Sequence, residues 1–180
     1  VKVTGKFTPL QQWLHVDAFE VLPTFVADGS ATGPDFAPLN SRYDDLIAMV
    51  GVSTLRKLHQ ASTFQVGCGA LGCEFLKNFA LMGVACADAA SGVPPEAAGV
   101  VTVTDNDRIE VSNLSRQFLF REENVGQPKS VAATRAAVKM NGAFRVKAHE
   151  LLVAPQTEAT FDDAFWQKQT FVTNALDNVK

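Results

Sequence analysis

Short apolar runs alternate with stretches of helical periodicity along most of this chain. Runs of β-branched and aromatic residues at 63–66, 100–104, 144–148 and 170–175 predict strands. Because helical segments lie between them, the pattern favours an α/β fold. We expect a Rossmann-like, mostly parallel sheet with helices on both faces.

A helix is predicted directly after the first of these strands, ending near Gly83. Its apolar residues recur at helical spacing, so we expect them to form the face that packs on the sheet. The residues of this predicted face are Leu71, Phe75, Phe79 and Met82.

Two further helices are predicted, one before the first strand and one after the second. The longer one runs from Lys129 to Met140. A shorter one follows Ser53, and its inward residues are expected to be Leu55 and Leu58.

Residues 1–40 differ in character from the rest of the chain. The run Thr8-Pro9-Leu10-Gln11 has the residue types of a helix N-cap, first turn and capping box. Residues 28–38 are rich in glycine, proline and alanine and predict a linker. We therefore expect a helical segment with a linker at 1–40 and the α/β domain at 41–180.

Composition excludes several classes of protein. The formal net charge is −3, which does not favour a nucleic-acid-binding surface. No apolar run is long enough to span a bilayer, so we expect no membrane partner. The three cysteines form no Cys-x-x-Cys pair, which favours a reduced cytoplasmic or nuclear location. Because the chain starts at Val1 without methionine, we expect it to be a piece of a larger protein.

A glycine-rich turn joins the first strand to its helix. Gly67-x-Gly69-x-x-Gly72 would let the turn tighten and let phosphates approach the helix N-terminus. The alternative is a turn that needs glycine only for close packing of helix on strand. The acidic residue expected about 20 residues later falls at Asp88, inside a predicted loop at 87–99. That loop explains why the strand-end acid comes later, at Asp105.

Asp105 opens the most informative segment of the chain, residues 105–118. An acid at the end of a buried strand is well placed to hydrogen-bond a nucleotide ribose. Asn113, Arg116 and Gln117 follow it and supply hydrogen-bond donors. The alternative for Asp105, and still more for Asp107, is a solvated turn aspartate.

Two charged residues further along fit the same chemistry. Lys129 begins a helix, where its charge opposes the helix dipole unless a polyphosphate arrives. Asp177 follows the last predicted strand, and a carboxylate there could hold Mg²⁺. The alternatives are an ordinary solvated lysine and a turn aspartate.

Taken together, these motifs resemble the active adenylation domain of the ubiquitin-activating enzymes. The pattern Asn-Leu-x-Arg-Gln-Phe at 113–118 is specific to this adenylating superfamily. Other segments that look like the family are Ser41-Arg42-Tyr43-Asp44, Cys73-Glu74, Lys77-Asn78-Phe79, Val103-Thr104-Asp105 and Asn174-Ala175-Leu176-Asp177-Asn178.

The resemblance implies that ATP is attacked at its α-phosphate by the C-terminal carboxylate of ubiquitin, giving an acyl-adenylate and pyrophosphate. It implies that Asp105 binds the ribose, that Asn113, Arg116 and Lys129 act on the phosphates, and that Asp177 holds Mg²⁺. The other residues expected to bind the nucleotide are Gly67, Gly69, Ala70, Gly72, Asp107, Gln117 and Asn178.

The resemblance also implies partners. These are ubiquitin, ubiquitin-conjugating enzymes and a second adenylation half of the same protein, which would supply another arginine. The catalytic-cysteine domain of the family has no counterpart here, so we expect the piece to be inactive alone.

Three alternatives stay open. The substrate could be another ubiquitin-like modifier. The glycine turn with Asp105 alone would also suit a nicotinamide-dependent oxidoreductase. A third possibility is a non-catalytic scaffold, because adenylation halves of this superfamily can lose their site.

Overall fold

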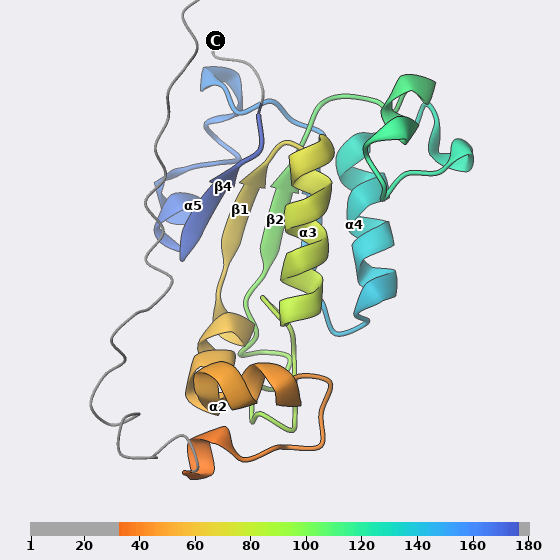
Figure 1. The fold of residues 1–180 in the computed structure, drawn as a ribbon. Coiled ribbons are helices and arrows are strands. Elements are labelled where there is room, and N and C mark those ends of the chain that lie inside the picture. The colour runs from red at the N-terminus through yellow and green to blue at the C-terminus, as the bar shows by residue number, and fades with distance from the viewer. Residues whose placement is uncertain (1–32, 177–180) are drawn as a thin grey trace, which may run out of the picture. The chain divides into compact units, whose positions relative to one another are not determined.

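The computed structural model describes residues 33–176, which contain a four-stranded sheet (Figure 1). The strands are β1 Thr63–Val66, β2 Val101–Thr104, β3 Val146–His149 and β4 Phe171–Asn174. Their order is β3-β2-β1-β4, and all neighbours are parallel. The predicted α/β fold and its strands are confirmed. The strand ends shift by at most two residues, an ordinary uncertainty for element boundaries.

The strand order contains a reversal that positions the site. From β1 the chain moves to β2 and β3 on one side, and then returns to place β4 on the other side of β1. Val66 pairs with Thr104 of β2 and with Asn174 of β4, so these three strands end at one edge. Ligands of open α/β sheets bind outside the carboxyl ends of the strands at such a reversal.

Two helices, α3 Ala70–Met82 and α4 Lys129–Met140, cover one face of the sheet side by side (Figure 1). The predicted helix at 129–140 is thereby confirmed at both ends, and α3 ends at Gly83 in the left-handed conformation. The core between these helices and the sheet includes Leu76, Phe79, Val101, Val103, Ala133 and Ala137.

The predicted packing face of α3 is wrong at both ends of the helix. Leu71 is 63% exposed and Met82 is 40% exposed, whereas Phe79 is buried and Phe75 packs against the core. The fully packed positions of α3 are Gly72, Cys73, Leu76, Phe79 and Ala80. Several of these are small residues that allow the helix to approach the sheet closely, and a count of large apolar side chains misses them.

The opposite face of the sheet is covered by aromatic side chains that follow β3. Phe64 of β1 lies against Phe161, Phe165 and Trp166, with ring centroids 4.9–5.4 Å apart. The last two of these belong to α5, Asp163–Gln167, which Figure 1 shows beside β4. The prediction of helices on both faces is therefore confirmed.

Helix α2, Asp44–Gln60, begins earlier than the sequence pattern predicts. Gly51 interrupts it with φ 79° and ψ 158°, so a helix beginning after Ser53 describes only its second half. In that half Leu55 is buried and Leu58 is half-buried, as predicted. None of the helices in the described part of the chain is long and apolar enough to cross a bilayer.

The predicted N-terminal helix at 8–22 lies outside the described residues. The described part of the predicted linker at 28–38 contains a short 3-10 helix, Pro34–Phe36. Asp35 in this turn accepts hydrogen bonds from the backbone N–H and the hydroxyl of Ser53. This end of the linker is therefore fastened to α2.

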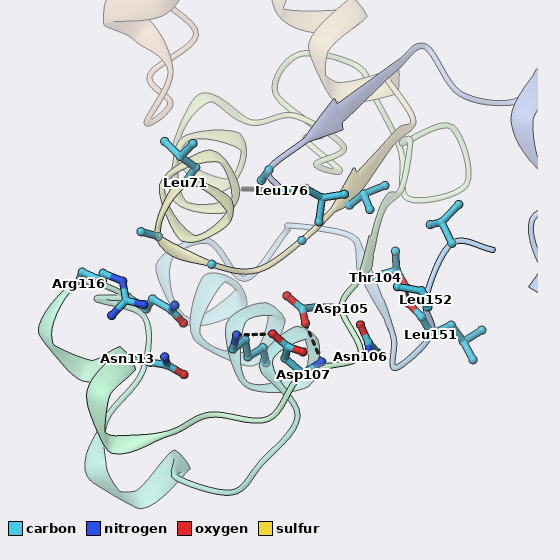
Figure 2. Close-up of a pocket in the computed structure, with 18 residues that line it drawn as sticks. Leu71, Thr104, Asp105, Asn106, Asp107, Asn113, Arg116, Leu151, Leu152 and Leu176 are labelled. Atoms are coloured by element: carbon cyan, nitrogen blue, oxygen red, sulfur yellow. Dashed lines mark hydrogen bonds and ion pairs between the residues drawn. The ribbon is translucent and has the colours of Figure 1, made fainter. Parts of the chain in front are cut away.

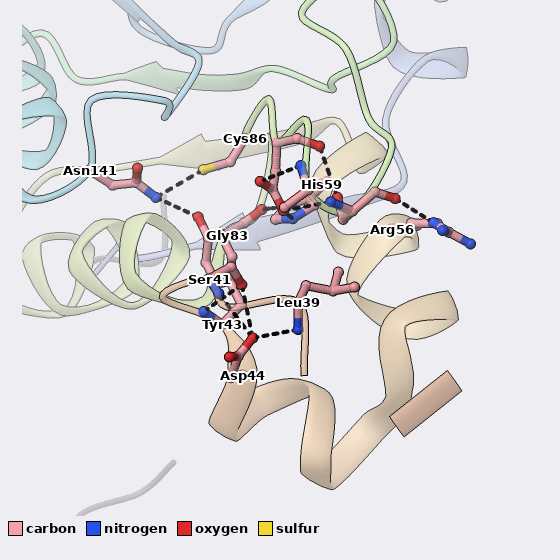
Figure 3. Close-up of polar contacts among 12 residues, drawn as sticks. Leu39, Ser41, Tyr43, Asp44, Arg56, His59, Gly83, Cys86 and Asn141 are labelled. Atoms are coloured by element: carbon pink, nitrogen blue, oxygen red, sulfur yellow. Dashed lines mark hydrogen bonds and ion pairs between the residues drawn. The ribbon is translucent and has the colours of Figure 1, made fainter. Parts of the chain in front are cut away.

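The loop at 87–99 contains no helix or extended strand, as predicted, but it is anchored. The carboxylate of Asp88 lies 3.4 Å from Nε2 of His59, which is fully buried at the end of α2. Arg56, also on α2, donates to the Ser91 carbonyl (Figure 3). The extra length of this loop is thus packed against α2.

Asn141 joins three elements in a buried polar network (Figure 3). Its Nδ2 donates to the Tyr43 hydroxyl and to the Ala80 carbonyl, each at 2.8 Å. Burial raises the pKa of Tyr43 to about 12, so this hydroxyl stays neutral at physiological pH. The network ties the start of α2 and the end of α4 to α3.

The change Asn141→Ala tests this network. It removes the donor from the Tyr43 hydroxyl, the Ala80 carbonyl and the Cys86 sulfur, so we expect the free energy of unfolding to fall by about 2–3 kcal/mol. Urea titration followed by circular dichroism measures the loss. Ser115→Ala removes an exposed hydroxyl with one backbone partner and should change stability by less than about 0.5 kcal/mol. Equal losses in the two variants would contradict the assignment.

Candidate functional site

A cavity of about 350 Å³ lies at the carboxyl ends of β1 and β2. It sits at the strand-order reversal, where the topology predicts a ligand site. The residues that line it are Val66, Gly67, Gly69, Ala70, Leu71, Thr104, Asp105, Asn106, Asp107, Asn113, Arg116, Gln117, Lys129, Leu151, Leu152, Val153, Ala175 and Leu176.

The glycine turn forms the floor of the cavity beside the start of α3. Gly67 has φ 98°, which only glycine adopts without strain. Gly69 is the N-cap of α3 and provides no side-chain hydrogen bond to the first turn. The N–H groups there carry partial positive charge, so this end of α3 suits an anion. A Cβ built on Gly69 meets nothing within 4 Å, so the turn is open to a ligand.

Gly72 does not line the cavity, although it was predicted among the nucleotide-binding residues. A Cβ at this position would lie 2.3 Å from the carbonyl oxygen of Gly67. Glycine is therefore required there for close approach of α3 to the turn. For this residue the packing explanation of the glycine motif holds.

Asp105 fastens the turn to the end of β2. Its Oδ2 accepts from the Cys68 N–H at 2.6 Å, and its Oδ1 accepts from the Asp107 N–H at 2.8 Å. Carboxylate oxygens can each accept a second hydrogen bond, so the group can still bind a ligand hydroxyl. Asp105 thus holds the glycine turn in place and also lines the cavity.

Lys129 and Asp107 form an ion pair inside the cavity, with Nζ 2.8 Å from Oδ2 (Figure 2). The lysine side chain is 11% exposed and the aspartate is 62% exposed. The carboxylate offsets the unfavourable position of Lys129 at the first residue of α4. A polyphosphate is therefore not required to explain that position, and the lysine remains available as a charge beside the turn.

Asn113, Arg116 and Gln117 approach the cavity from the loop that follows β2. Asn113 is held because its Oδ1 accepts from the Glu110 N–H at 2.9 Å. Arg116 donates through Nη1 to the Ser112 carbonyl, which leaves its other N–H groups for a ligand. Gln117 is 3% exposed, and its Oε1 has no hydrogen-bond partner in the described part of the chain. A ligand that donates a hydrogen bond would satisfy this oxygen.

The opposite side of the cavity is apolar, and sequence reasoning missed it. Figure 2 shows Leu151 and Leu152 across the cavity from Asn113 and Arg116. The run Leu151-Leu152-Val153 follows the carboxyl end of β3, at the same sheet edge as Asp105. The strand-end argument that identified Asp105 would also have found this run.

The predicted metal ligand Asp177 and the predicted nucleotide ligand Asn178 lie outside the described residues. Their neighbours Ala175 and Leu176 line the cavity directly after β4. Among residues 33–176, no group of three or more histidine, cysteine or acidic side chains could hold a metal ion.

The cysteines near the turn are not suited to act as nucleophiles. Cys68 and Cys73 are buried, and burial raises the pKa of both thiols, that of Cys73 to about 11. Cys86, in the core, also has its pKa raised to about 11 by burial. All three thiols are therefore protonated near neutral pH, which agrees with the packing role expected for Cys68.

Comparison with known proteins identifies the family. Residues 43–180 match the model of the ThiF family, so the chain belongs to this family. It is 52% identical to ubiquitin-activating enzyme E1 1 of Arabidopsis thaliana, over 98% of this chain and 15% of that protein. It is 45% identical to human ubiquitin-like modifier-activating enzyme 6, over 99% of this chain and 16% of that protein. The chain thus spans about one sixth of the length of these relatives.

Solved structures share the fold. E. coli tRNA N6-threonylcarbamoyladenosine dehydratase, TcdA, superposes with a TM-score of 0.63 at 23% identity, covering 77% of this chain and 51% of that chain. E. coli MccB superposes with a TM-score of 0.57 at 25% identity, covering 72% of this chain and 36% of that chain.

Substitutions at two glycines test the shape of the turn. Gly72→Ala forces a Cβ against the Gly67 carbonyl, so we expect the free energy of unfolding to fall by about 2 kcal/mol or more. Gly69→Ala adds the same methyl group in open space at φ −73°, so only the poorer N-cap preference of alanine opposes it, and the cost should be about 1 kcal/mol or less. Denaturant titration compares the two. The packing role of Gly72 is wrong if it tolerates alanine as well as Gly69 does.

Alkylation tests the assignment of the thiols. Because burial raises their pKa values, iodoacetamide at pH 8 should modify the folded chain much more slowly than a free cysteine. Raising the pH from 8 to 10 should still leave most of the Cys73 and Cys86 thiols protonated, whereas unfolding in urea should release all three cysteines. Mass spectrometry counts the modified residues. Rapid modification of Cys68 in the folded chain at pH 8 would contradict this.

Proposed function

We propose that this chain is the ATP-binding part of an enzyme that adenylates the C-terminal carboxylate of ubiquitin. The observation that supports the proposal is the convergence, on one cavity, of an anion-binding turn, a strand-end acid and two cationic side chains. The similarity to ubiquitin-activating enzymes of plants, over nearly the whole chain, supports the choice of ubiquitin as substrate.

The polar side of the cavity fits a polyphosphate. The start of α3 offers N–H groups at the positive end of a 13-residue helix. Arg116 and Lys129 line the same cavity and add full positive charges. A triphosphate would compete with Asp107 for the lysine, and the charges gained would offset the loss of that ion pair.

The rest of the cavity fits a nucleoside. Asp105 can accept from ribose hydroxyls, while Leu151, Leu152 and Val153 offer an apolar surface for a base. A cavity of about 350 Å³ is within the ordinary size of a small-molecule site. Two proteins of the same fold have been solved with nucleotides, TcdA with ATP and MccB with AMPCPP.

The chemical task of these residues is positioning and charge neutralisation. Attack of a carboxylate on the α-phosphate gathers negative charge on the phosphoryl oxygens, which preorganised cations stabilise. Arg116 and Lys129 would supply that charge, and Asn113 would orient a phosphate oxygen. Asp177 would hold Mg²⁺, which neutralises phosphate charge, as its position after β4 and the family resemblance suggest.

A nicotinamide-dependent reaction would use only the turn and Asp105, and it gives no role to Arg116 and Lys129 beside them. The scaffold alternative likewise leaves this cationic set without a function. The proposed partners are ubiquitin, ubiquitin-conjugating enzymes and a second adenylation half of the intact protein. We also propose that the protein acts in the cytoplasm and nucleus.

The change Arg116→Ala tests the proposal in the intact protein that contains this chain. It removes a cation from the phosphate side of the cavity, so we expect ubiquitin-dependent exchange of pyrophosphate into ATP to fall about 100-fold. Arg108→Ala is the matched control. Arg108 lies on the same loop, donates to the Gly126 carbonyl and does not line the cavity, so its loss should leave exchange unchanged.

Three outcomes would decide against parts of the proposal. No exchange in the unaltered protein with ubiquitin, ATP and Mg²⁺ would reject ubiquitin adenylation. Exchange that needs another ubiquitin-like modifier would keep the site and change the substrate. Equal activity of the two arginine variants would remove Arg116 from the reaction.

A further inference from the structure

A buried amide side chain from β1 forms hydrogen bonds with both ends of the glycine turn. Gln65 lies on β1 and is fully buried, and it does not line the cavity. Its Nε2 donates to the carbonyl of Gly67 at 3.0 Å and to the carbonyl of Gly72 at 3.0 Å. One amide group therefore joins the first and last glycines of the turn.

These bonds fix the orientation of a particular peptide group. The carbonyl of Gly67 and the N–H of Cys68 belong to one planar unit and point in opposite directions. Gln65 holds the carbonyl, and Asp105 accepts from the N–H at 2.6 Å. The peptide is thus held from both sides, and with it the position of the Asp105 carboxylate relative to the turn.

The amide oxygen of Gln65 shows that the buried amide destabilises the fold. The Oε1 is buried and has no hydrogen-bond partner in the described part of the chain. A buried acceptor without a partner destabilises a protein, and a leucine in its place would avoid that cost. Core packing alone therefore does not account for a glutamine at this position.

We infer that Gln65 is a positioning residue for nucleotide binding. It clamps the Gly67–Cys68 peptide so that the turn and Asp105 present a preformed surface to the phosphates and the ribose. The inference rests on the proposed ATP site, but the clamp itself exists without ligand. Removing the amide should loosen the turn and leave the rest of the sheet in place.

The test uses Gln65→Leu and Gln65→Met in the intact protein. Both variants fill the buried site with an apolar side chain of similar size and lack the amide donors. We expect the KM for ATP in ubiquitin-dependent pyrophosphate exchange to rise about three- to tenfold, the effect of losing a positioning hydrogen bond. The KM for ubiquitin should stay unchanged. Two variants are used so that one that fails to fold does not end the test.

Thr63→Val is the matched control. Thr63 lies on the same face of β1, is also fully buried, and donates to the Phe171 carbonyl at 2.9 Å, away from the turn. Its loss should lower the melting temperature without changing the KM for ATP. An unchanged KM in both glutamine variants, or an equal rise in Thr63→Val, would overturn the inference.

Amide hydrogen exchange separates this inference from the proposed function. Without nucleotide, the Cys68 N–H should exchange faster in Gln65→Leu than in the unaltered protein, while amides of β2 stay protected. If the unaltered protein binds no ATP but Cys68 shows this change, the proposed function is wrong and the clamp stands. Unchanged exchange at Cys68 would reject the clamp, whatever the protein binds.

Discussion

The hydrogen bond from the Cys68 N–H to the Asp105 carboxylate is the contact on which the site depends. It joins the turn after β1 to the end of β2, and the parallel register of these strands places both at one sheet edge. Without it, the turn and the acid would be two separate loop features. With it, they form one wall of a cavity whose polar groups are in place before a ligand arrives. Such preorganisation lowers the cost of ordering on binding.

Close approach of α3 to the sheet makes that contact possible. Gly72 packs on the Gly67 carbonyl, and the amide of Gln65 reaches both residues from β1. Small residues along α3 continue this close packing away from the site. The geometry that suits an anion is therefore produced by the core beneath the turn as much as by the turn itself.

Much of the fold could be predicted because local pattern and tertiary structure agree. The strands and the helix 129–140 follow from periodicity, and the place of Asp105 follows from the shared edge of parallel strands. The grouping of Asn113, Arg116 and Lys129 with it is expected from the family resemblance, and all four residues line the cavity. The failures have physical reasons. The predicted face of α3 is wrong because small residues, rather than Leu71 and Met82, pack against the sheet.

Other features depend on tertiary contacts that periodicity does not report. The ion pair between Lys129 and Asp107 joins residues far apart in the sequence, as does the pair formed by His59 and Asp88. Gln65 donates to backbone carbonyls, and a hydrogen bond to the backbone cannot be predicted from the sequence of side chains. The roles of Asp177 and Asn178 stay predictions.

The most direct measurement is a structure of the intact protein with a non-hydrolysable ATP analogue. We expect phosphates over the start of α3 between Arg116 and Lys129, a ribose hydroxyl hydrogen-bonded to Asp105, and the base against Leu151 and Leu152. A nucleotide bound away from the glycine turn, or one whose ribose does not contact Asp105, would contradict this expectation.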